Sequence, residues 1–318
     1  MHKVHTVPQR SDIEHAHAVI KPYIHRTPVL SSQSINKITG IELFFKCENF
    51  QKIGAFKIRG GTCAALALSD EEKQNGIATH SSGNHAQAVA LSAQRLGLKA
   101  YIVMPSNAPP VKIAATKGYG AEVTFCDPTL EARESTLAQV VARTGATEIH
   151  PYNNYNIITG AATAAKELIE DTEGLDIILA PIGGGGLMSG TALSTRYFLP
   201  GAEVIGAEPE NVDDAFRSFK AGAMLYNTTT DTIADGLRTN LGEKTFDIIL
   251  RYVDDIITVS EKEIAEAMRL LWERMKIVVE PSSAVPFAAV LKSKDRFTGK
   301  RIGIILSGGN VNLNDLPF

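Results

Sequence analysis

One lysine of this chain lies in an unusual setting for a charged residue. In the stretch QKIGAFKIRG, residues 51–60, Lys57 directly follows an alanine and Phe56 and precedes an isoleucine. A lysine held among apolar groups is costly when charged, so its pKa falls. The neutral amine can then form a Schiff base with an aldehyde. The commoner alternative for any single lysine is a surface position, where its aliphatic stem covers apolar atoms and its charge stays in water.

A run of four glycines indicates a phosphate site. Residues 183–186 lie between the apolar stretch DIILAPI and the helical pattern LMSGTALSTRYF. Successive glycines let the backbone turn tightly and direct several N–H groups at one phosphate. No Lys-Ser/Thr pair follows, as it would in a Walker loop, and the spacing and acidic partner of a dinucleotide fold are missing. We therefore expect a phosphate that does not belong to a dinucleotide, with a flexible linker as the alternative.

Two further polar stretches also follow apolar runs. SSGNHAQA, residues 81–88, opens a helical pattern, and free N–H groups at a helix start attract an anion such as a carboxylate. A helix cap with nothing bound is the alternative there. In LSGGN, residues 306–310, Ser307 can form one hydrogen bond with a ring nitrogen, although an ordinary turn explains this stretch when it is taken alone. Together with the lysine and the glycines, these stretches predict pyridoxal 5′-phosphate and an amino-acid substrate.

The elements that must position these residues form a regular alternation. Short apolar runs such as ELFFKC, KAYIVMP, AEVIGAEP and KRIGIIL alternate with helical patterns such as PVKIAATKG. This alternation is typical of parallel βαβ units, so we predict an α/β fold. Such sheets place their sites at the carboxyl ends of the strands, where the three polar loops lie.

Composition excludes several classes of protein. The 318 residues are 44% hydrophobic and 21% charged, which is ordinary for a globular protein. A net charge of −3 provides no basic excess for nucleic acid. The three cysteines show no CxxC spacing, no signal peptide is recognisable, and no apolar run reaches the ~20 residues that span a bilayer. We expect a reduced, cytoplasmic protein without nucleic-acid or membrane partners.

The motifs FQKIGAFKIRGG, SSGNHAQA, GGGGLMSG and LSGGN, in this order, resemble the fold-type II pyridoxal phosphate enzymes, whose architecture is that of the tryptophan synthase β chain. Within this group the chain is most similar to serine racemases and serine/threonine dehydratases, from RTPVLSS near the start to GGNVNL near the end. The resemblance implies two domains, each an open, mainly parallel sheet flanked by helices. Residues 1–76 and 148–318 would form the large cofactor-binding domain, residues 77–147 a small, mobile substrate-binding domain, and two chains a homodimer.

The resemblance also implies roles for residues that match the motifs of the family. The positions are Lys57 and Ser82 for catalysis; Phe56, Lys57, Asn84, Gly183, Gly184, Gly185, Gly186, Leu187 and Ser307 for the cofactor; and Ser81, Ser82, Asn84, His85 and Arg133 for the substrate. Lys57 would move the Cα proton on one face of the substrate, and Ser82 would stand on the opposite face.

The implied function is that of a serine racemase with serine/threonine dehydratase activity. A serine at the pyridine nitrogen does not keep it protonated, which favours prompt loss of a β-hydroxyl group over a long-lived carbanion. Arg133 leaves an alternative open, because a guanidinium can bind a second carboxylate and thus select threo-3-hydroxyaspartate. Ala161, Ala162 and Tyr152 depart from common family residues, so the preferred substrate is not determined by the sequence.

The stretch AEPENVDDAF resembles a cation site of serine racemase-like proteins. Glu208 and Asp214 would be the side-chain ligands of Mg²⁺, Ca²⁺ or Mn²⁺, with the Val212 carbonyl between them. Carboxylates, a carbonyl and water suit such an ion, although a solvated acidic loop is the alternative. A role for ATP as an activator is implied by Lys112, Tyr119 and Gln87, which match positions linked to ATP in some members.

Overall fold

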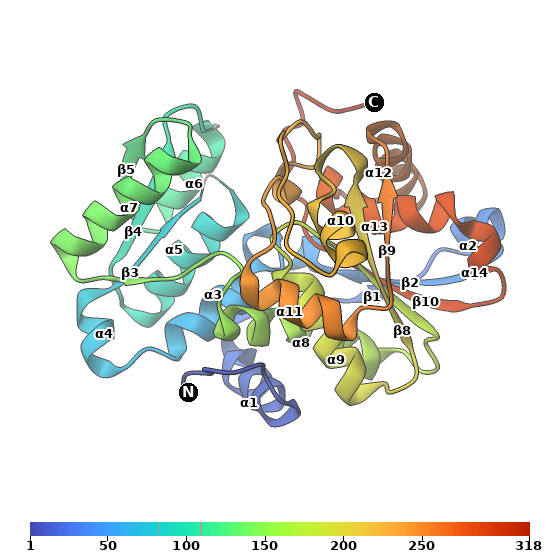
Figure 1. Ribbon diagram of the computed structural model, residues 1–318, viewed down its shortest axis with the longest axis horizontal. Helices are drawn as coiled ribbons and strands as arrows, with labels where there is room; N and C mark the ends of the chain where they lie inside the picture. Colours follow the sequence, from blue (N-terminus) through green and yellow to red (C-terminus); the bar gives the residue numbers. More distant parts are fainter. Residues whose placement is uncertain (82, 109) are drawn as a thin grey trace.

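The computed structural model describes residues 1–81, 83–108 and 110–318, and it contains two separate sheets (Figure 1). The larger sheet has six strands in the order β1-β2-β10-β7-β8-β9. Their bounds are Val29–Leu30, Glu42–Cys47, Arg301–Leu306, Ile177–Pro181, Glu203–Pro209 and Asp255–Val259. β1 pairs antiparallel with β2, and the other neighbours are parallel.

The smaller sheet has four strands in the order β5-β4-β3-β6, all of them parallel. Their bounds are Glu122–Cys126, Ala100–Pro105, Ile77–His80 and Thr147–Glu148. All four come from one continuous part of the chain, whereas the larger sheet is built from the segments before and after it. The α/β class with mainly parallel sheets, predicted from the alternation of apolar runs, is confirmed.

Helices cover both faces of the larger sheet because its strands are apolar on both sides. α2 (Gln33–Thr39), α12 (Glu261–Met275) and α13 (Pro281–Lys292) pack against one face. On the other face lie α8 (Tyr155–Asp171), α9 (Gly186–Phe198), α10 (Asp214–Ala221) and α11 (Glu243–Tyr252). In β10, Ile304 belongs to the first core and Ile305 to the second, as the two-residue period of a strand requires.

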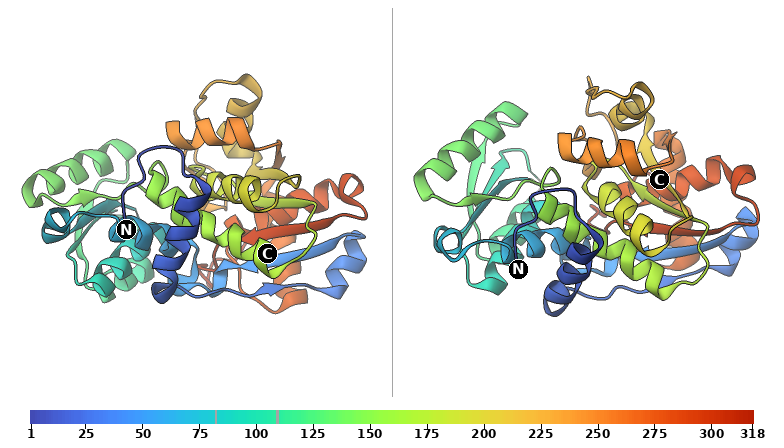
Figure 2. Two further views of the ribbon diagram at one scale, coloured as in Figure 1. Left: turned by 90° about the horizontal axis from the view of Figure 1, so that it is seen from below. Right: turned by 60° about the horizontal axis from the view of Figure 1, so that its bottom comes forward.

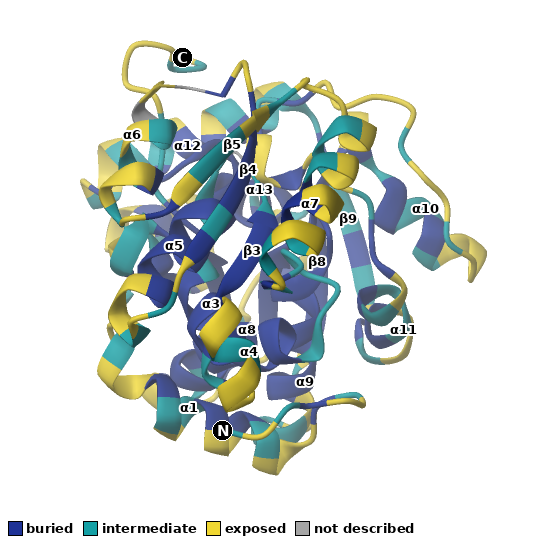
Figure 3. Cartoon of the chain, turned by 90° about the vertical axis from the view of Figure 1, so that its left-hand side faces the viewer, coloured by how far each residue is buried: buried dark blue, intermediate teal, exposed yellow. Residues whose placement is uncertain are grey.

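The smaller sheet is also covered on both faces. α5 (Asn84–Leu96) packs on one side, and α7 (Leu130–Thr144) covers the other. α6 (Pro110–Gly118) packs against α5, and the short α4 (Asp70–Asn75) leads into β3. Figure 3 shows α4 and α7 with exposed outer surfaces, whereas α3 and α8 behind them are largely buried.

Helix α3 (Lys57–Leu66) lies between the two sheets, in contact with α5 on one side and α8 on the other. Glycines allow its close approach to α8: a Cβ atom added at Gly160 would lie 2.5 Å from the Arg59 carbonyl oxygen. α1 (Arg10–Ile20) packs below α8 (Figure 2). The first residue of α3 is Lys57, so the lysine singled out by the sequence stands at the junction of the two sheets.

The last short helix, α14 (Lys294–Phe297), precedes β10. Within the described ranges, none of the helices has the length and apolar character needed to cross a bilayer.

Candidate active site

The sequence-predicted loops follow three strands whose carboxyl ends face the space between the sheets. The glycine run follows β7, Ser307 follows its neighbour β10, and Ser81 follows β3 of the smaller sheet. Because β7 and β10 are parallel neighbours, the glycine run and Ser307 lie at the same edge.

Backbone pairing brings Lys57 next to Ser307. The N–H of Phe56 donates to the Ser307 carbonyl at 3.0 Å, and Ala55 pairs with Gly308 in an isolated antiparallel bridge. The N–H of Gly309 donates to the Gly54 carbonyl at 2.9 Å. These contacts join segments about 250 residues apart, and they place the first turn of α3 beside the end of β10.

The amine of Lys57 is well placed to act as a nucleophile or base. Its Nζ donates to the Pro151 carbonyl at 2.9 Å and lies 5.2 Å from the centre of the Phe56 ring. Loss of hydration lowers the pKa of Lys57 to about 8, and the nearby Glu280 carboxylate opposes this effect. A pKa near 8 leaves about a tenth of the amine unprotonated at pH 7, far more than for an ordinary lysine. This direction is the one expected from the apolar neighbours of Lys57.

The glycine run leads into the start of α9 and is packed too tightly for side chains. A Cβ atom at Gly183 would lie 2.8 Å from the Cα of Leu237, and one at Gly184 would lie 2.3 Å from the ring of Tyr152. Gly185 has a φ of 83°, in the left-handed region that favours glycine. Among the described residues, the N–H groups of residues 183–187 have no backbone acceptor. A helix start with free amides fits a phosphate, so the loop suits the phosphate of pyridoxal phosphate.

The Ser307 hydroxyl is buried beside a second serine. Its Oγ lies 3.1 Å from Oγ of Ser283, which also exchanges hydrogen bonds with the carbonyl and N–H of Gly308. Ser307 carries no charge, so it can form a neutral hydrogen bond with a ring nitrogen but cannot hold that nitrogen protonated.

Asn84, at the start of α5, connects the smaller sheet to the larger one. Its Nδ2 donates to both oxygens of Glu280, at 3.0 and 3.2 Å, and its Oδ1 accepts from Asn310 Nδ2 at 2.8 Å. Burial raises the pKa of Glu280 to about 7, with a further contribution from the charge of Asp235. Glu280 and Asn310 were not among the sequence-predicted site residues, although Asn310 lies in LSGGN, one of the motifs that carry the resemblance.

Replacing Glu280 with glutamine should lower the pKa of Lys57 below about 8, because the Glu280 carboxylate is the charge that opposes the effect of burial. The amine is then free at a lower pH. We expect the pH midpoint for reaction of the cofactor-free protein with pyridoxal phosphate, followed by absorbance, to shift downward. Glu273→Gln, on the outer surface of α12, is the matched control and should leave the midpoint in place. A midpoint that moves upward in Glu280→Gln would contradict this assignment.

The predicted substrate residues differ in how they are held. The N–H of Ser81 donates to the Val103 carbonyl at 3.1 Å, which fixes the start of its loop. His85 is buried; its Nε2 lies 2.9 Å from the Ile149 carbonyl, and burial puts its pKa well below the usual range. The Nδ1 atom of His85 has no hydrogen-bond partner among the described residues. Ser82, the predicted catalytic serine, lies outside the described residues.

Arg133 lies on α7, near the carboxyl end of β3. Its Nε donates to the Thr129 carbonyl at 3.2 Å, and its side chain is half-buried. Burial and the charge of Arg133 both lower the pKa of His80, the last residue of β3. Arg133 therefore lies close to the residue that directly precedes Ser81.

The segment that follows β6, residues 150–152, also lies at the candidate site, although none of the predicted site residues belongs to it. Pro151 accepts the hydrogen bond of Lys57, and the Tyr152 ring lies against Gly184. His150 packs edge-on against Tyr152, with ring centres 4.7 Å apart, and burial lowers its pKa to about 4. His150 is therefore a neutral group near Lys57. Tyr152 was noted from the sequence only as a departure from serine racemases.

The two predicted metal ligands lie close together and are fully buried. Glu208 accepts two backbone N–H groups of α10, and Asp214 accepts that of Leu241. Burial and the charge of Asp214 raise the pKa of Glu208 well above its usual range, and burial raises the pKa of Asp214 to about 6. Val212 ends the short helix η4 (Glu210–Val212) between them. No group of three or more His, Cys, Asp or Glu that could hold a metal occurs in the described part of the chain.

The three residues matched to ATP lie on or near the helices of the smaller sheet. Lys112 on α6 forms an ion pair at 2.7 Å with Asp235, which begins the short helix η5 (Asp235–Leu237) outside the segment of the smaller sheet. Gln87 is buried in α5, and Tyr119 packs against the core around that helix.

Comparison with known proteins gives a consistent result. The family described as "Pyridoxal-phosphate dependent enzyme" matches residues 20–308. A β-hydroxyaspartate dehydratase of Paracoccus denitrificans is 48% identical over 312 residues, covering 98% of this chain and 99% of the relative. An L-threo-3-hydroxyaspartate ammonia-lyase of Saccharomyces cerevisiae is also 48% identical, covering 96% and 94%. The crystal structure of serine racemase from Dictyostelium discoideum is 48% identical with a TM-score of 0.92, covering 96% and 99% of the two chains.

Proposed function

The chain belongs to the family of pyridoxal-phosphate dependent enzymes, and from this premise we propose that it is a serine racemase that also dehydrates serine and threonine to a 2-oxo acid and ammonia. The observation that carries the proposal is the Lys57 amine, with a pKa of about 8, held beside the glycine loop and Ser307. Relatives of nearly the same length carry racemase and ammonia-lyase names at similar identity.

When bound, the cofactor would delocalise the electrons left on the substrate Cα after its proton is removed. The residues of the chain provide the rest. Backbone N–H groups of the glycine loop hold the phosphate, and the Ser307 hydroxyl holds the ring nitrogen without a charge. The Nζ of Lys57 takes the proton from Cα on one face, and can deliver it to the departing β-hydroxyl group. Burial lowers the pKa values of His85 and His150, which leaves Lys57 as the stronger base of the three.

Ser82 is proposed to deliver a proton on the opposite face, as the resemblance implies. Racemisation and dehydration are then two outcomes of the same proton removal. A Ser82→Ala variant that still forms D-serine from L-serine would exclude this role.

A second substrate, threo-3-hydroxyaspartate, is supported by the position of Arg133. Its half-buried guanidinium lies near His80, beside the substrate loop, where it can bind a second carboxylate. The test of the proposed function is a panel of L- and D-serine, L-threonine and the 3-hydroxyaspartate isomers, in which both keto acid and enantiomer are measured. Product from none of these substrates would overturn the proposal.

We expect Arg133→Met to lower kcat/KM for 3-hydroxyaspartate by about 10- to 100-fold, the worth of a charged hydrogen bond. The rate with serine should change much less, because serine has no second carboxylate. Arg143→Met, on the exposed side of the same helix, is the matched control. Equal losses for both substrates would show that Arg133 does not read the β-carboxylate.

A divalent cation, Mg²⁺, Ca²⁺ or Mn²⁺, is proposed between Glu208 and Asp214. Two buried carboxylates with raised pKa values support this, one of them, Glu208, raised in part by the charge of Asp214, since a hard cation would neutralise both. EDTA should lower the midpoint of thermal unfolding, and Mg²⁺ should restore it. Asp214→Asn should remove this response, whereas Asp213→Asn, which replaces a carboxylate paired with Arg217, should retain it. A midpoint that is the same with EDTA and with Mg²⁺ would exclude the site.

The remaining proposals concern assembly and regulation. We propose the division into a domain of residues 1–76 and 148–318 and a mobile domain of residues 77–147, which the two separate sheets support. A homodimer is supported by Phe50 and Val278, both 45% exposed and adjacent because Asn49 donates to the Val278 carbonyl. A mass of 34.2 kDa in solution, that of one chain, would exclude the dimer.

Three free thiols support a cytoplasmic location. Activation by ATP is proposed to involve Lys112, and adding ATP to the assay tests it.

A further inference from the structure

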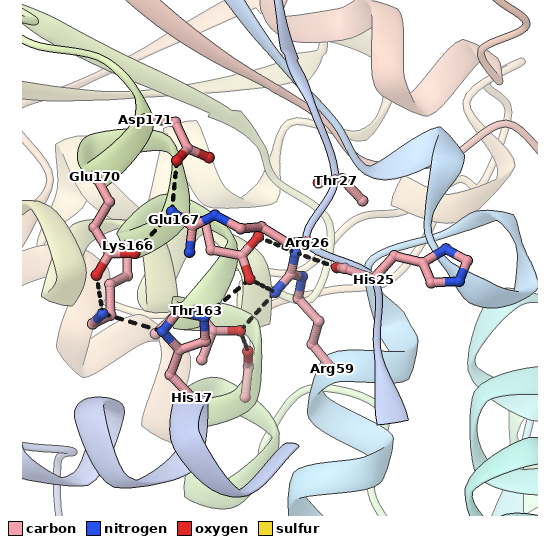
Figure 4. A network of polar contacts seen from close by, with 12 residues as sticks. His17, His25, Arg26, Thr27, Arg59, Thr163, Lys166, Glu167, Glu170 and Asp171 are labelled. Carbon is pink, nitrogen blue, oxygen red and sulfur yellow. Dashed lines mark hydrogen bonds and ion pairs between the residues drawn. The ribbon is translucent and has the colours of Figure 1, made fainter. Parts of the chain in front are cut away.

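A network of buried charges lies beneath the first turn of α3, and the proposed mechanism does not use it (Figure 4). At its centre is Arg59, two residues after Lys57 and fully buried. Its Nε and Nη2 donate to the two oxygens of Glu48 at 2.7 and 2.8 Å. Its Nη1 and Nη2 donate to the two oxygens of Glu167 at 2.9 and 2.7 Å. The guanidinium therefore binds two carboxylates, each in a forked arrangement.

The partners of Arg59 come from elements that are fixed independently of α3. Glu48 directly follows β2 of the larger sheet, and Glu167 lies in the C-terminal part of α8. A third contact, from Nη1 to the Thr163 hydroxyl at 3.1 Å, also reaches α8. Arg59 thus ties the first turn of α3 both to the end of a core strand and to the neighbouring helix.

This connection adds to the backbone contacts with the end of β10 that already hold the start of α3. Phe56, the residue before the helix, makes no side-chain capping bond. Gly60 and Gly160 let the backbones of α3 and α8 approach closely, and a Cβ atom at Gly60 would lie 2.8 Å from the Ile157 carbonyl oxygen. The Arg59 fork adds a directional side-chain restraint on the first turn, from which the Lys57 side chain projects.

Stability alone does not account for such a network. Burying charges is costly, and apolar residues of similar size often stabilise a core at least as well. The innermost members, Lys46 and Arg59 against Glu48 and Glu167, are all at most 1% exposed and balance in charge. A forked guanidinium fixes its own orientation relative to its partners, and an apolar side chain does not.

We propose that Arg59 is a positioning residue for Lys57: its forks to Glu48 and Glu167 fix the first turn of α3 so that the Lys57 amine stays against the Pro151 carbonyl. The inference rests on the proposed function of Lys57 as the reactive amine. It assigns Arg59 no contact with substrate or cofactor.

Arg59→Lys tests whether the forked hydrogen bonds of Arg59 fix the first turn of α3. Lysine keeps the positive charge but has a single ammonium group, which cannot reproduce four bonds to two carboxylates. The first turn should loosen, the Lys57 amine should reach water, and its pKa should rise toward that of an ordinary lysine. Glu48→Asp retains all charges but shortens one partner of Arg59, so it should also raise the pKa of the Lys57 amine. The matched control is Glu170→Asp, a similar change at the partly exposed edge of the network, where Glu170 contacts Lys166 and Arg26.

The readout is the reactivity of Lys57 itself, in the full-length protein after removal of any cofactor. Trace acetic anhydride is added between pH 6 and 10, and acetylation of Lys57 is measured by mass spectrometry, with Lys52 as the internal control. We expect the pH midpoint of Lys57 to rise by about one unit in Arg59→Lys, so that labelling near neutral pH falls about tenfold. Lys52 in the same samples, and both lysines in Glu170→Asp, should react as in the unchanged protein.

An unchanged Lys57 midpoint in a folded Arg59→Lys protein would overturn the proposal. Should that variant fail to fold, as judged by circular dichroism, Glu48→Asp decides by the same measurement. Failure of the proposed function gives a different result, because Lys57 of the unchanged protein would then titrate like an ordinary lysine.

Discussion

Replacing Lys57 with alanine should reduce the formation of keto acid and of the opposite enantiomer by about a thousandfold or more. The loss has two causes that act together. In the proposed function the amine binds the cofactor aldehyde covalently, and its Nζ is the base for the Cα proton; general-base catalysis alone contributes about 10²- to 10⁴-fold. His85 and His150 are poor replacements, since burial lowers the pKa values of both and both rings are held by hydrogen bonds to the backbone.

The measurement separates loss of chemistry from loss of the cofactor. Pyridoxal phosphate should still bind Lys57→Ala through the glycine loop, but borohydride should no longer fix it to the chain. In the unchanged protein, borohydride should label the peptide that contains Lys57. Lys52→Ala, five residues earlier in the chain, is the matched control and should retain both activity and labelling. Near-normal turnover by Lys57→Ala would show that another group carries the reaction.

The second large effect is expected at the glycine loop. An alanine at Gly184 would place its Cβ atom 2.3 to 2.4 Å from three carbons of the Tyr152 ring, so either the loop or the ring must move. Overpacking of this kind costs about 1–3 kcal/mol, and since the loop's amides must align on the phosphate, we expect cofactor affinity to fall by roughly 10- to 100-fold. Equilibrium dialysis of pyridoxal phosphate against Gly184→Ala measures the loss.

Two variants establish that the contact with Tyr152 is the cause. Gly118→Ala is the matched control, because a Cβ atom there meets nothing within 4 Å. Tyr152→Ala removes the ring, so the double variant Gly184→Ala/Tyr152→Ala should recover much of the affinity that Gly184→Ala loses. If the double variant binds no better than Gly184→Ala, crowding against Tyr152 is not the reason for the glycine.

Local sequence was sufficient to predict the class of fold, and it supplied the reactive groups of the proposed function. Apolar runs alternating with helical patterns predicted two-sided parallel sheets, because a strand covered on both faces must be apolar on both. Likewise, the apolar neighbours of Lys57 predicted its lowered pKa, since desolvation acts over a few ångströms, and four successive glycines predicted a turn with free amides. Each of these properties depends on residues that are adjacent in the chain.

Tertiary structure alone decided how those groups are oriented. Lys57 meets the carbonyl of Pro151, Asn84 meets Glu280 and Asn310, and the loop at Gly184 meets Tyr152. In the sequence, Arg59 was one residue of the motif around Lys57 and had no assigned role. In the fold, it forms ion pairs with Glu48 and Glu167. These pairs are far apart in sequence, and no spacing rule specifies which side chain of a distant helix will fill a given position. Sequence by itself therefore determined the class of fold and which residues we propose to react, whereas packing between distant segments determined where their atoms point.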